Sequence, residues 1–123
     1  MAISVLVVDD DAAFRALAVH ILEGMGFCVV GEADTVQGAA ATARKLRPQA
    51  ALVDVVLPDG SGITLAAELA ALPWGPRIVL TSSDGGAVTE TSARAVGAAA
   101  FIAKQDLPDG RLCALLTGRP QAE

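Results

Sequence analysis

Hydrophobic residues along the chain alternate between two kinds of pattern. Short continuous apolar runs rich in Val, Ile and Leu, typical of strands buried on both faces of a parallel sheet, occur at residues 3–8, 27–32, 51–56, 77–81 and 99–103. After each run, apolar residues recur at the three- and four-residue spacing of an amphipathic helix. The first such stripe consists of Phe14, Leu17, Ala18, Ile21, Leu22 and Met25. Four further helices are expected at residues 35–46, 63–72, 88–96 and 107–116.

This alternation predicts the fold class. Five strands and five helices with short connections indicate an α/β domain with a parallel sheet covered by helices on both faces. Right-handed crossovers leave few topologies. We expect the flavodoxin-like (βα)5 three-layer sandwich with the five-stranded order 2-1-3-4-5. A chain of 123 residues, 53% of them hydrophobic, suffices for one domain with a single core, expected at 3–116 with a polar tail at 117–123.

Composition excludes several classes of function. The net charge is −5 and Lys and Arg do not cluster along the chain, whereas sequence-independent nucleic-acid binding relies on basic side chains that neutralise phosphates. No apolar run reaches the roughly 18–20 residues of a membrane span, and no signal-peptide pattern is present. We therefore expect a cytoplasmic protein that binds neither nucleic acid nor membrane directly. Cys28 and Cys113 are expected to be buried free thiols.

Polar side chains follow four of the five predicted strands at their carboxyl ends. They are Asp9, Asp10 and Asp11 after the first strand, Asp54 in the third, Thr81, Ser82 and Ser83 after the fourth, and Lys104 after the fifth. Because the carboxyl ends of parallel strands meet at one edge, we expect these groups to converge in one cleft. Carboxylates suit Mg²⁺, an Asp can act as a nucleophile, and Lys binds phosphate. The combination predicts a magnesium-dependent aspartyl-phosphate site.

Each group also has a simpler interpretation. An acid between a strand and a helix can cap the helix, although one acid is enough for that. Asp54 can begin the turn that LPDG continues, hydroxyls often make local caps, and Lys104 can be a solvated lysine. Their joint occurrence at four strand ends favours the phosphoryl site. His20 lies away from the apolar stripe, so we expect it to face solvent and to take no part in a phosphorelay.

Four motifs carry a resemblance to a known family. VLVVDDD, LVDVVLPDGSG, IVLTSS and GAAAFIAK stand in the order and spacing of receiver domains of bacterial two-component response regulators, of the chemotaxis-regulator type, over residues 3–116. The resemblance implies that Asp54 accepts a phosphoryl group from a histidine kinase or a small phosphodonor. It implies a Mg²⁺ ion held by Asp10 directly, by Asp9 through water, and by Asp54 and the backbone carbonyl of Val56.

The resemblance also implies how the phosphoryl group would be sensed. Thr81 is similar to the family's switch hydroxyl, Ser82 lies beside it as a further binding group, and Lys104 would pair with a phosphoryl oxygen. Phe101 takes the place of the switch aromatic, often Tyr. Phosphorylation would then bias the face made by the fourth helix, fifth strand and fifth helix toward a protein effector or output domain. Phosphorylation-dependent dimerisation is left open.

Three alternatives remain open beside this interpretation. The chain could be the receiver of a longer DNA-binding transcriptional regulator. It could also be a receiver-like interaction module that works without phosphorylation, although intact Asp10, Asp54, Thr81 and Lys104 disfavour that. An enzyme acting on a separate small substrate is weaker still, because fold does not imply function. We expect no enzymatic activity beyond self-phosphorylation and self-dephosphorylation.

Three residues depart from the family pattern. Gln105 follows Lys104 where many receivers have Pro, and a cis bond before a non-proline residue would cost about 2.5–4 kcal/mol. Phe101 has no hydroxyl to donate, so only ring packing can contribute to the switch. Val56, two residues after the acceptor, is apolar and would hinder an attacking water. Our hypothesis is a comparatively long-lived phosphoryl group.

Overall fold

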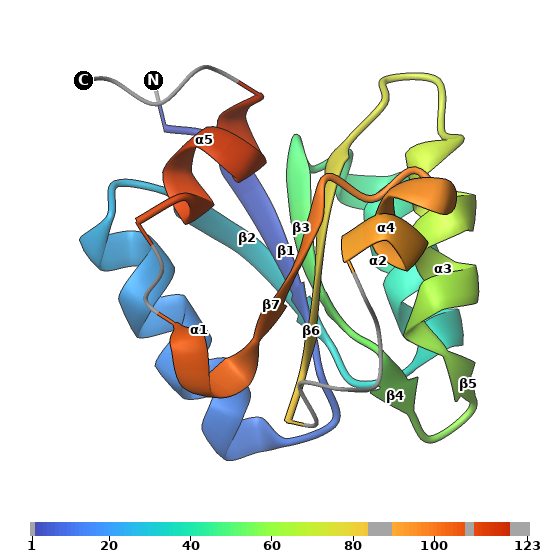
Figure 1. Cartoon of the computed structure of the whole chain (residues 1–123), viewed down its shortest axis with the longest axis horizontal. Coiled ribbons are helices and arrows are strands. Elements are labelled where there is room, and N and C mark those ends of the chain that lie inside the picture. The colour runs from blue at the N-terminus through green and yellow to red at the C-terminus, as the bar shows by residue number, and fades with distance from the viewer. Residues whose placement is uncertain (1, 84–89, 108–109, 119–123) are drawn as a thin grey trace.

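A five-stranded parallel sheet forms the centre of the molecule (Figure 1). The computed structural model describes residues 2–83, 90–107 and 110–118. The sheet has the order β2-β1-β3-β6-β7, which is the predicted order 2-1-3-4-5 of the main strands. These strands are β1 (Ser4–Val8), β2 (Cys28–Ala33), β3 (Ala50–Asp54), β6 (Arg77–Ser82) and β7 (Ala100–Ala103).

Helices cover both faces of this sheet, as predicted (Figure 1). One face carries α1 (Ala12–Gly24) and α5 (Leu112–Thr117), and the other carries α2 (Val36–Leu46), α3 (Gly62–Ala70) and α4 (Glu90–Ala95). Alternate residues of each central strand enter two apolar clusters. In β1, for example, Val5 and Val7 contribute to the cluster under α1 and α5, whereas Leu6 and Val8 contribute to the cluster under α2, α3 and α4.

Three helices begin at the carboxyl edge of the sheet with a capping side chain. Asp11 accepts hydrogen bonds from the first turn of α1, Thr35 from that of α2, and Ser61 from that of α3. Each cap satisfies backbone N–H groups that have no partner inside the helix. The start of each helix beside the site is therefore fixed by a local hydrogen bond.

Two predicted elements were wrong in their extent. The third strand ends at Asp54 and not at residue 56, because Val56–Leu57 (β4) turns back to pair with Gly60–Ser61 (β5) in an antiparallel hairpin. The last helix begins at Leu112 and not at residue 107, because Lys104–Asp106 forms a short 3-10 helix (η1) directly after β7. The helix expected at 88–96 is observed as α4, with residues 88–89 outside the described part of the chain.

The predictions of burial were wrong at three positions. Cys28 and Cys113 are exposed free thiols. Cys28 lies on the edge strand β2, and Cys113 lies off the buried stripe of α5. Leu17 is 53% exposed, because Ala18 and Leu22 are the residues of α1 that face the core.

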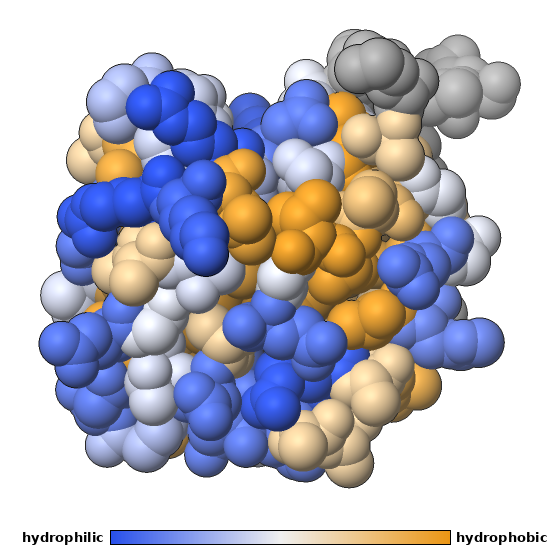
Figure 2. Space-filling model, turned by 180° about the vertical axis from the view of Figure 1, so that it is seen from behind, coloured by the Kyte–Doolittle hydropathy of each residue, from blue (hydrophilic) through white to orange (hydrophobic). Residues whose placement is uncertain are grey.

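The view from behind shows apolar side chains gathered at its centre, on the side of the molecule where β2 forms the edge (Figure 2). Within the described ranges, no helix is long and apolar enough to cross a bilayer.

Asp59 ties the β4–β5 hairpin to the start of α2. Its two carboxylate oxygens accept hydrogen bonds from the backbone N–H of Val36 at 2.7 Å and of Gln37 at 3.1 Å. The bond from Val36, followed by that from Gln37, lowers the pKa of the Asp59 carboxyl. An ionised carboxylate at the N-terminus of a helix is also favoured by the helix dipole.

We expect Asp59→Ala to lower the thermal stability of the domain at neutral pH, with Asp59→Asn in between because it retains one acceptor. A lowered folded-state pKa means that the carboxylate stabilises the fold above its ordinary pKa of 3.8. That contribution is lost as the pH falls through the folded-state pKa. Thermal unfolding at neutral and increasingly acidic pH should therefore show the difference between wild type and Asp59→Ala shrinking in acid. A difference that is independent of pH would contradict this role.

Candidate functional site

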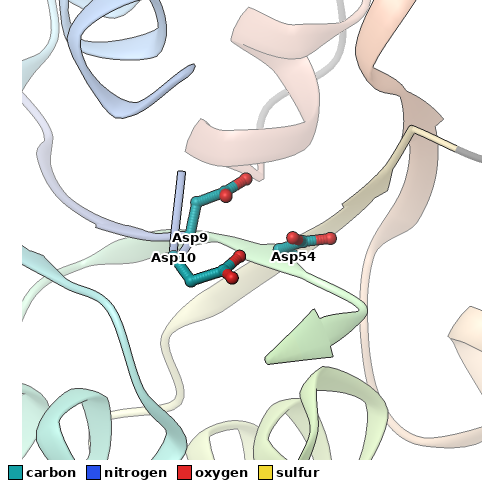
Figure 3. A group of neighbouring side chains, drawn as sticks. All are labelled: Asp9, Asp10 and Asp54. Carbon is teal, nitrogen blue, oxygen red and sulfur yellow. The ribbon is translucent and has the colours of Figure 1, made fainter. Parts of the chain in front are cut away.

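Three acids from two strand ends meet at the carboxyl edge of the sheet (Figure 3). Asp9 and Asp10 follow β1, and Asp54 is the last residue of β3. One carboxylate oxygen of each lies within 4.8 Å of the others. Asp9 and Asp54 are buried, whereas Asp10 is exposed. The predicted convergence of these side chains is therefore present in the structure.

The three consecutive acids Asp9, Asp10 and Asp11 make different contacts. Asp11 accepts from the N–H groups of Ala13 and Phe14 at 3.0 and 3.3 Å, so it is the residue to which the capping interpretation applies. Asp9 Oδ1 accepts from Asp11 N at 2.9 Å, which fixes the turn between strand and helix. The carboxylate of Asp10 is not used by the cap. Asp9 and Asp10 thus lie beside Asp54 with carboxylate oxygens directed at one another.

Lys104 places its ammonium group between two of these acids. Its Nζ lies 2.6 Å from Asp9 Oδ2 and 3.4 Å from Asp54 Oδ2. The same Nζ lies 4.4 Å from the centre of the Phe14 ring, within the range of a cation–π contact. Asp54 Oδ1 receives a long contact of 3.4 Å from Val56 N. Lys104 is therefore held by two carboxylates and a ring at the start of η1.

Burial and the like charge of a neighbouring acid raise the electrostatic energy of the ionised Asp54. Burial, followed by the neighbouring charge of Asp9, raises the pKa of Asp54, while Lys104 and the N–H of Val56 act in the opposite direction. Burial alone would lower the pKa of Lys104, but its contacts with Asp9 and Asp54 outweigh this, and the pKa is raised. Three carboxylates face one ammonium, so the site has an excess of negative charge that a cation would offset.

Thr81 supplies a hydroxyl beside the acceptor candidate. Its Cα is the register partner of Asp54 across β3 and β6, and Val55 N donates to its carbonyl at 2.8 Å. Thr81 is only 1% exposed, and its Oγ1 has no hydrogen-bond partner in the described ranges. An unpaired buried hydroxyl is costly. This group is therefore available to a ligand at the strand ends.

The remaining predicted residues lie close by in the fold. Ser82, the next residue of β6, is buried, and Phe101 is half-buried in β7, where it packs against the cluster under α2, α3 and α4. Val56 is 66% exposed in β4, next to the end of β3. The structure thus brings Ser82 and Val56 to the same edge as the acids, whereas Phe101 lies further back in β7, opposite Leu80.

The donor set fits a divalent magnesium ion. Mg²⁺ prefers oxygen ligands and usually takes one or two carboxylates together with waters and phosphate oxygens. Asp9, Asp10 and Asp54 offer such oxygens within a single cluster. The only cationic side chain in contact with the carboxylates of this cluster in the described ranges is Lys104, which offsets one of their three negative charges. A divalent cation would offset the rest.

Comparison with known proteins agrees with this geometry. The model of the response regulator receiver domain matches residues 5–116. The chain belongs to this family.

Individual relatives extend this assignment. The receiver is 32% identical over 113 residues to the acid tolerance regulatory protein ActR of Rhizobium meliloti, covering 92% of this chain and 58% of ActR. It is 30% identical over 104 residues to the chemotaxis protein CheY of Thermotoga maritima, covering 85% and 87% of the two chains. A CheY-like receiver domain structure from Methanospirillum hungatei superposes with a TM-score of 0.75 at 27% identity, covering 87% and 88%. The receiver spans only half to three-fifths of the length of the first curated relatives.

Sequence reasoning missed two side chains that shape the receiver site. Phe14 was assigned only to the core stripe, yet its ring contacts Lys104. Arg15 donates from Nη1 to the Asp9 carbonyl at 2.6 Å and pairs through Nε with Glu32 at 3.2 Å. No motif marks these contacts: Phe14 and Lys104 are far apart in the sequence, and the contact of Arg15 with the Asp9 carbonyl depends on the turn between β1 and α1. Phe14 and Arg15 thus position Lys104 and Asp9 from α1.

Gly62 allows the close approach of the hairpin to Asp54. Gly62 N donates to Val55 O at 2.7 Å, and a Cβ at Gly62 would lie 1.8 Å from the Asp54 carbonyl oxygen. No rotamer change can relieve a clash between Cβ and backbone. Gly62 is therefore the residue that lets the hairpin pack against the backbone at the end of β3.

We expect Gly62→Ala to destabilise the receiver by about 3 kcal/mol or more, because the backbone at Asp54 must move to admit one methyl group. Gly24→Ala is the matched control, since a Cβ there meets nothing within 4 Å. That substitution should leave stability within about 1 kcal/mol of wild type. Urea unfolding of the two variants measures both effects. Equal stabilities for the two variants would show that the contact at Gly62 is not restrictive.

Proposed function

We propose that this receiver is a phosphorylation-dependent signalling switch whose phosphoacceptor is Asp54. The observation that carries the proposal is the placement of a buried Asp54 carboxylate between two further acids and the ammonium of Lys104. An acid that merely began a turn would need neither burial nor these partners. The nearby unpaired hydroxyl of Thr81 supplies a donor for the added group.

The proposed reaction is a phosphoryl transfer. An oxygen of Asp54 attacks the phosphorus of a phosphohistidine on a histidine kinase, or of a small acyl phosphate. The new Asp54 O–P bond forms as the bond from phosphorus to the donor atom breaks, and the electron pair leaves with the donor. A Mg²⁺ ion held by Asp10, Asp54, the Val56 carbonyl and, through water, Asp9 would neutralise charge on the phosphoryl oxygens.

The protein groups have separate parts in this reaction. Lys104 offsets charge on a phosphoryl oxygen, and it also favours the ionised, nucleophilic form of Asp54 against burial and Asp9. The Thr81 hydroxyl donates to another phosphoryl oxygen once the group is attached. Electrostatic stabilisation of this kind is most effective in a partly buried site, where the effective dielectric constant is low. No other substrate is required, so we infer that the receiver is not an enzyme on a separate small molecule.

Movement of Thr81 toward the phosphoryl group would change the conformation of a surface away from Asp54. Thr81 pairs in register with Ile102 of β7, next to Phe101. We infer that the face formed by α4, β7 and α5 changes its affinity for a protein effector or an output domain in the cytoplasm. Phe101 can contribute packing but no hydrogen bond. The second candidate is the same switch acting on a DNA-binding output domain, because a longer Pseudomonas aeruginosa relative, 35% identical over 103 residues, is named a putative transcriptional regulator.

Phosphorylation of wild type with acetyl phosphate and Mg²⁺ should add one phosphoryl group. Asp54→Ala should add none, because the nucleophilic oxygen is absent. Asp34→Ala removes an exposed acid outside the carboxylate cluster and serves as the control, which should label like wild type. Intact mass spectrometry measures the added mass. Label that persists in Asp54→Ala would reject Asp54 as the acceptor, and wild type that stays unlabelled with Mg²⁺ and donor would favour the phosphorylation-independent module.

We expect Val56→Asn to shorten the lifetime of the phosphoryl group several-fold. The exposed Val56 side chain offers an attacking water no hydrogen bond, whereas Asn can orient it. Loss of label after removal of the donor measures the rate. Val30→Asn changes an exposed valine on the remote strand β2 and should leave the rate unchanged. A Val56→Asn variant that loses label no faster than wild type would contradict the hypothesis of a long lifetime.

A further inference from the structure

A hollow at the opposite end of the sheet has no role in the phosphoryl reaction. Its volume is about 350 Å³, and its wall includes Ile3, Arg47, Gln49, Trp74, Arg77 and Leu116. These residues lie where β1, β3 and β6 begin and where α2 and α5 end, at the top of Figure 1. The volume falls at the lower end of the range of small-molecule sites, which is roughly 300–1,000 Å³.

The charged side chains that line this hollow, Arg47 and Arg77, carry hydrogen-bond donors only. Arg77 Nε donates to the Leu115 carbonyl at 3.2 Å, which fixes the guanidinium and leaves its terminal N–H groups for a ligand. Gln49 Oε1 accepts from Ser4 N at 3.1 Å, so the amide nitrogen of Gln49 is the part left to donate. No Asp or Glu lines the hollow, and neither Arg47 nor Arg77 pairs with a carboxylate in the described ranges. Two guanidinium groups with no carboxylate beside them favour an anion.

The other part of the wall is apolar and rigid. Trp74 Nε1 donates to the Pro48 carbonyl at 2.9 Å, which fixes the plane of the indole. Arg47 lies over that indole, with Cζ 5.2 Å from the ring centre. Ile3 and Leu116 complete an apolar surface beside the two guanidinium groups. A ligand that fills the hollow therefore needs an apolar body as well as a charged head.

Arg47 occupies a backbone conformation that arginine seldom adopts. Its φ of 49° is the sole positive value of a non-glycine residue in the described ranges. Gly or Asn would normally end a helix in this left-handed conformation. The end of α2 does not itself favour arginine at this position. The side chain of Arg47 has a separate role there, which is its contact with the Trp74 ring.

The surroundings of the hollow are positively charged although the chain as a whole is acidic. Lys45 lies in the last turn of α2 near Arg47, and Arg77 also lines an adjoining depression. The acids of the phosphoryl site lie at the far edge of the same sheet. The net charge of −5 thus hides a separation of charge that favours an anion at this end.

We propose that this hollow binds a small amphipathic anion. A carboxylate or phosphate head lies between the guanidinium groups of Arg47 and Arg77, with the Gln49 amide as a further donor. An aromatic or compact aliphatic body lies against Trp74, Ile3 and Leu116. The site is separate from Asp54, and it does not depend on the proposed phosphorylation.

The single tryptophan of the chain makes the hollow directly observable, since all indole fluorescence comes from Trp74. Phenyl phosphate and benzoate serve as probes with the two heads. Benzyl alcohol lacks the charge, and inorganic phosphate lacks the body. We expect a saturable fluorescence change with at least one aromatic anion, and binding that is weaker by about tenfold or more with both control compounds. No saturable change with either anion, or equal binding of benzyl alcohol or inorganic phosphate, overturns the proposal.

Arginine variants separate this site from general attraction to a basic surface. Arg77→Gln and Arg47→Asn should each weaken the aromatic anion by about tenfold, since each removes a charged donor. Asn suits the left-handed backbone at position 47, and thermal unfolding verifies that both variants fold. Arg44→Gln is the matched control, because Arg44 pairs with Glu68 at 3.0 Å and does not line the hollow. Asp54→Ala should bind like wild type. Unchanged binding in Arg77→Gln and Arg47→Asn, or an equal loss in Arg44→Gln, rejects the site.

Discussion

The burial of two acids beside one lysine is the constraint on which this receiver depends. Asp9 and Asp54 lie in the interior at the ends of neighbouring strands, and Lys104 contacts both. Buried ionised groups are costly unless paired, and like charges at close range increase that cost. Lys104 offsets part of it, and the remaining negative charge is what makes the cleft suitable for a cation and a phosphoryl group. The buried like charges that suit the site to its proposed function are therefore also the charges that destabilise the fold locally.

The surrounding structure holds these charges in place through backbone contacts. Arg15 contacts the Asp9 carbonyl from α1, and Gly62 brings the β4–β5 hairpin against the backbone of Asp54. The same hairpin carries Asp59, whose carboxylate receives the first N–H groups of α2. Asp54 is thus held by the sheet on one side. On the other side it is held by the β4–β5 hairpin, which Asp59 ties to α2. Such fixation limits the reorganisation needed when charge develops at the site.

The sequence predicted the sheet and the convergence of the site better than it predicted local exposure. Strand order and the meeting of Asp54 with Asp9, Asp10, Thr81 and Lys104 follow from hydrophobic period and from the shared edge of parallel strands. The strand order depends on the whole hydrophobic pattern, so no single apolar residue decides it. Exposure depends on which neighbours a side chain finds.

Several local features do not follow from the hydrophobic pattern of the sequence. Cys28 sits in an apolar run but lies on the edge strand, where no neighbour covers it. Leu17 fits the helical stripe, yet Ala18 and Leu22 fill the space against the sheet. The β4–β5 hairpin was hidden because LPDG signals a turn without showing that the chain pairs across it. The contact of Phe14 with Lys104 joins residues far apart in sequence, which no local pattern contains.

The two ends of the sheet carry opposite charge, and strand β6 connects them. Arg77 begins this strand at the basic end, and Thr81 and Ser82 finish it at the acidic end. Arg77 also holds the last turn of α5 through the Leu115 carbonyl, and α5 belongs to the face proposed to carry the output. An anion at Arg77 and a phosphoryl group at Asp54 would thus act on the same strand and helix from opposite ends. Because opposite charges line the two proposed sites, we expect an anion to enter the basic end without a cation, whereas the proposed phosphoryl group at the acidic end would need one beside it.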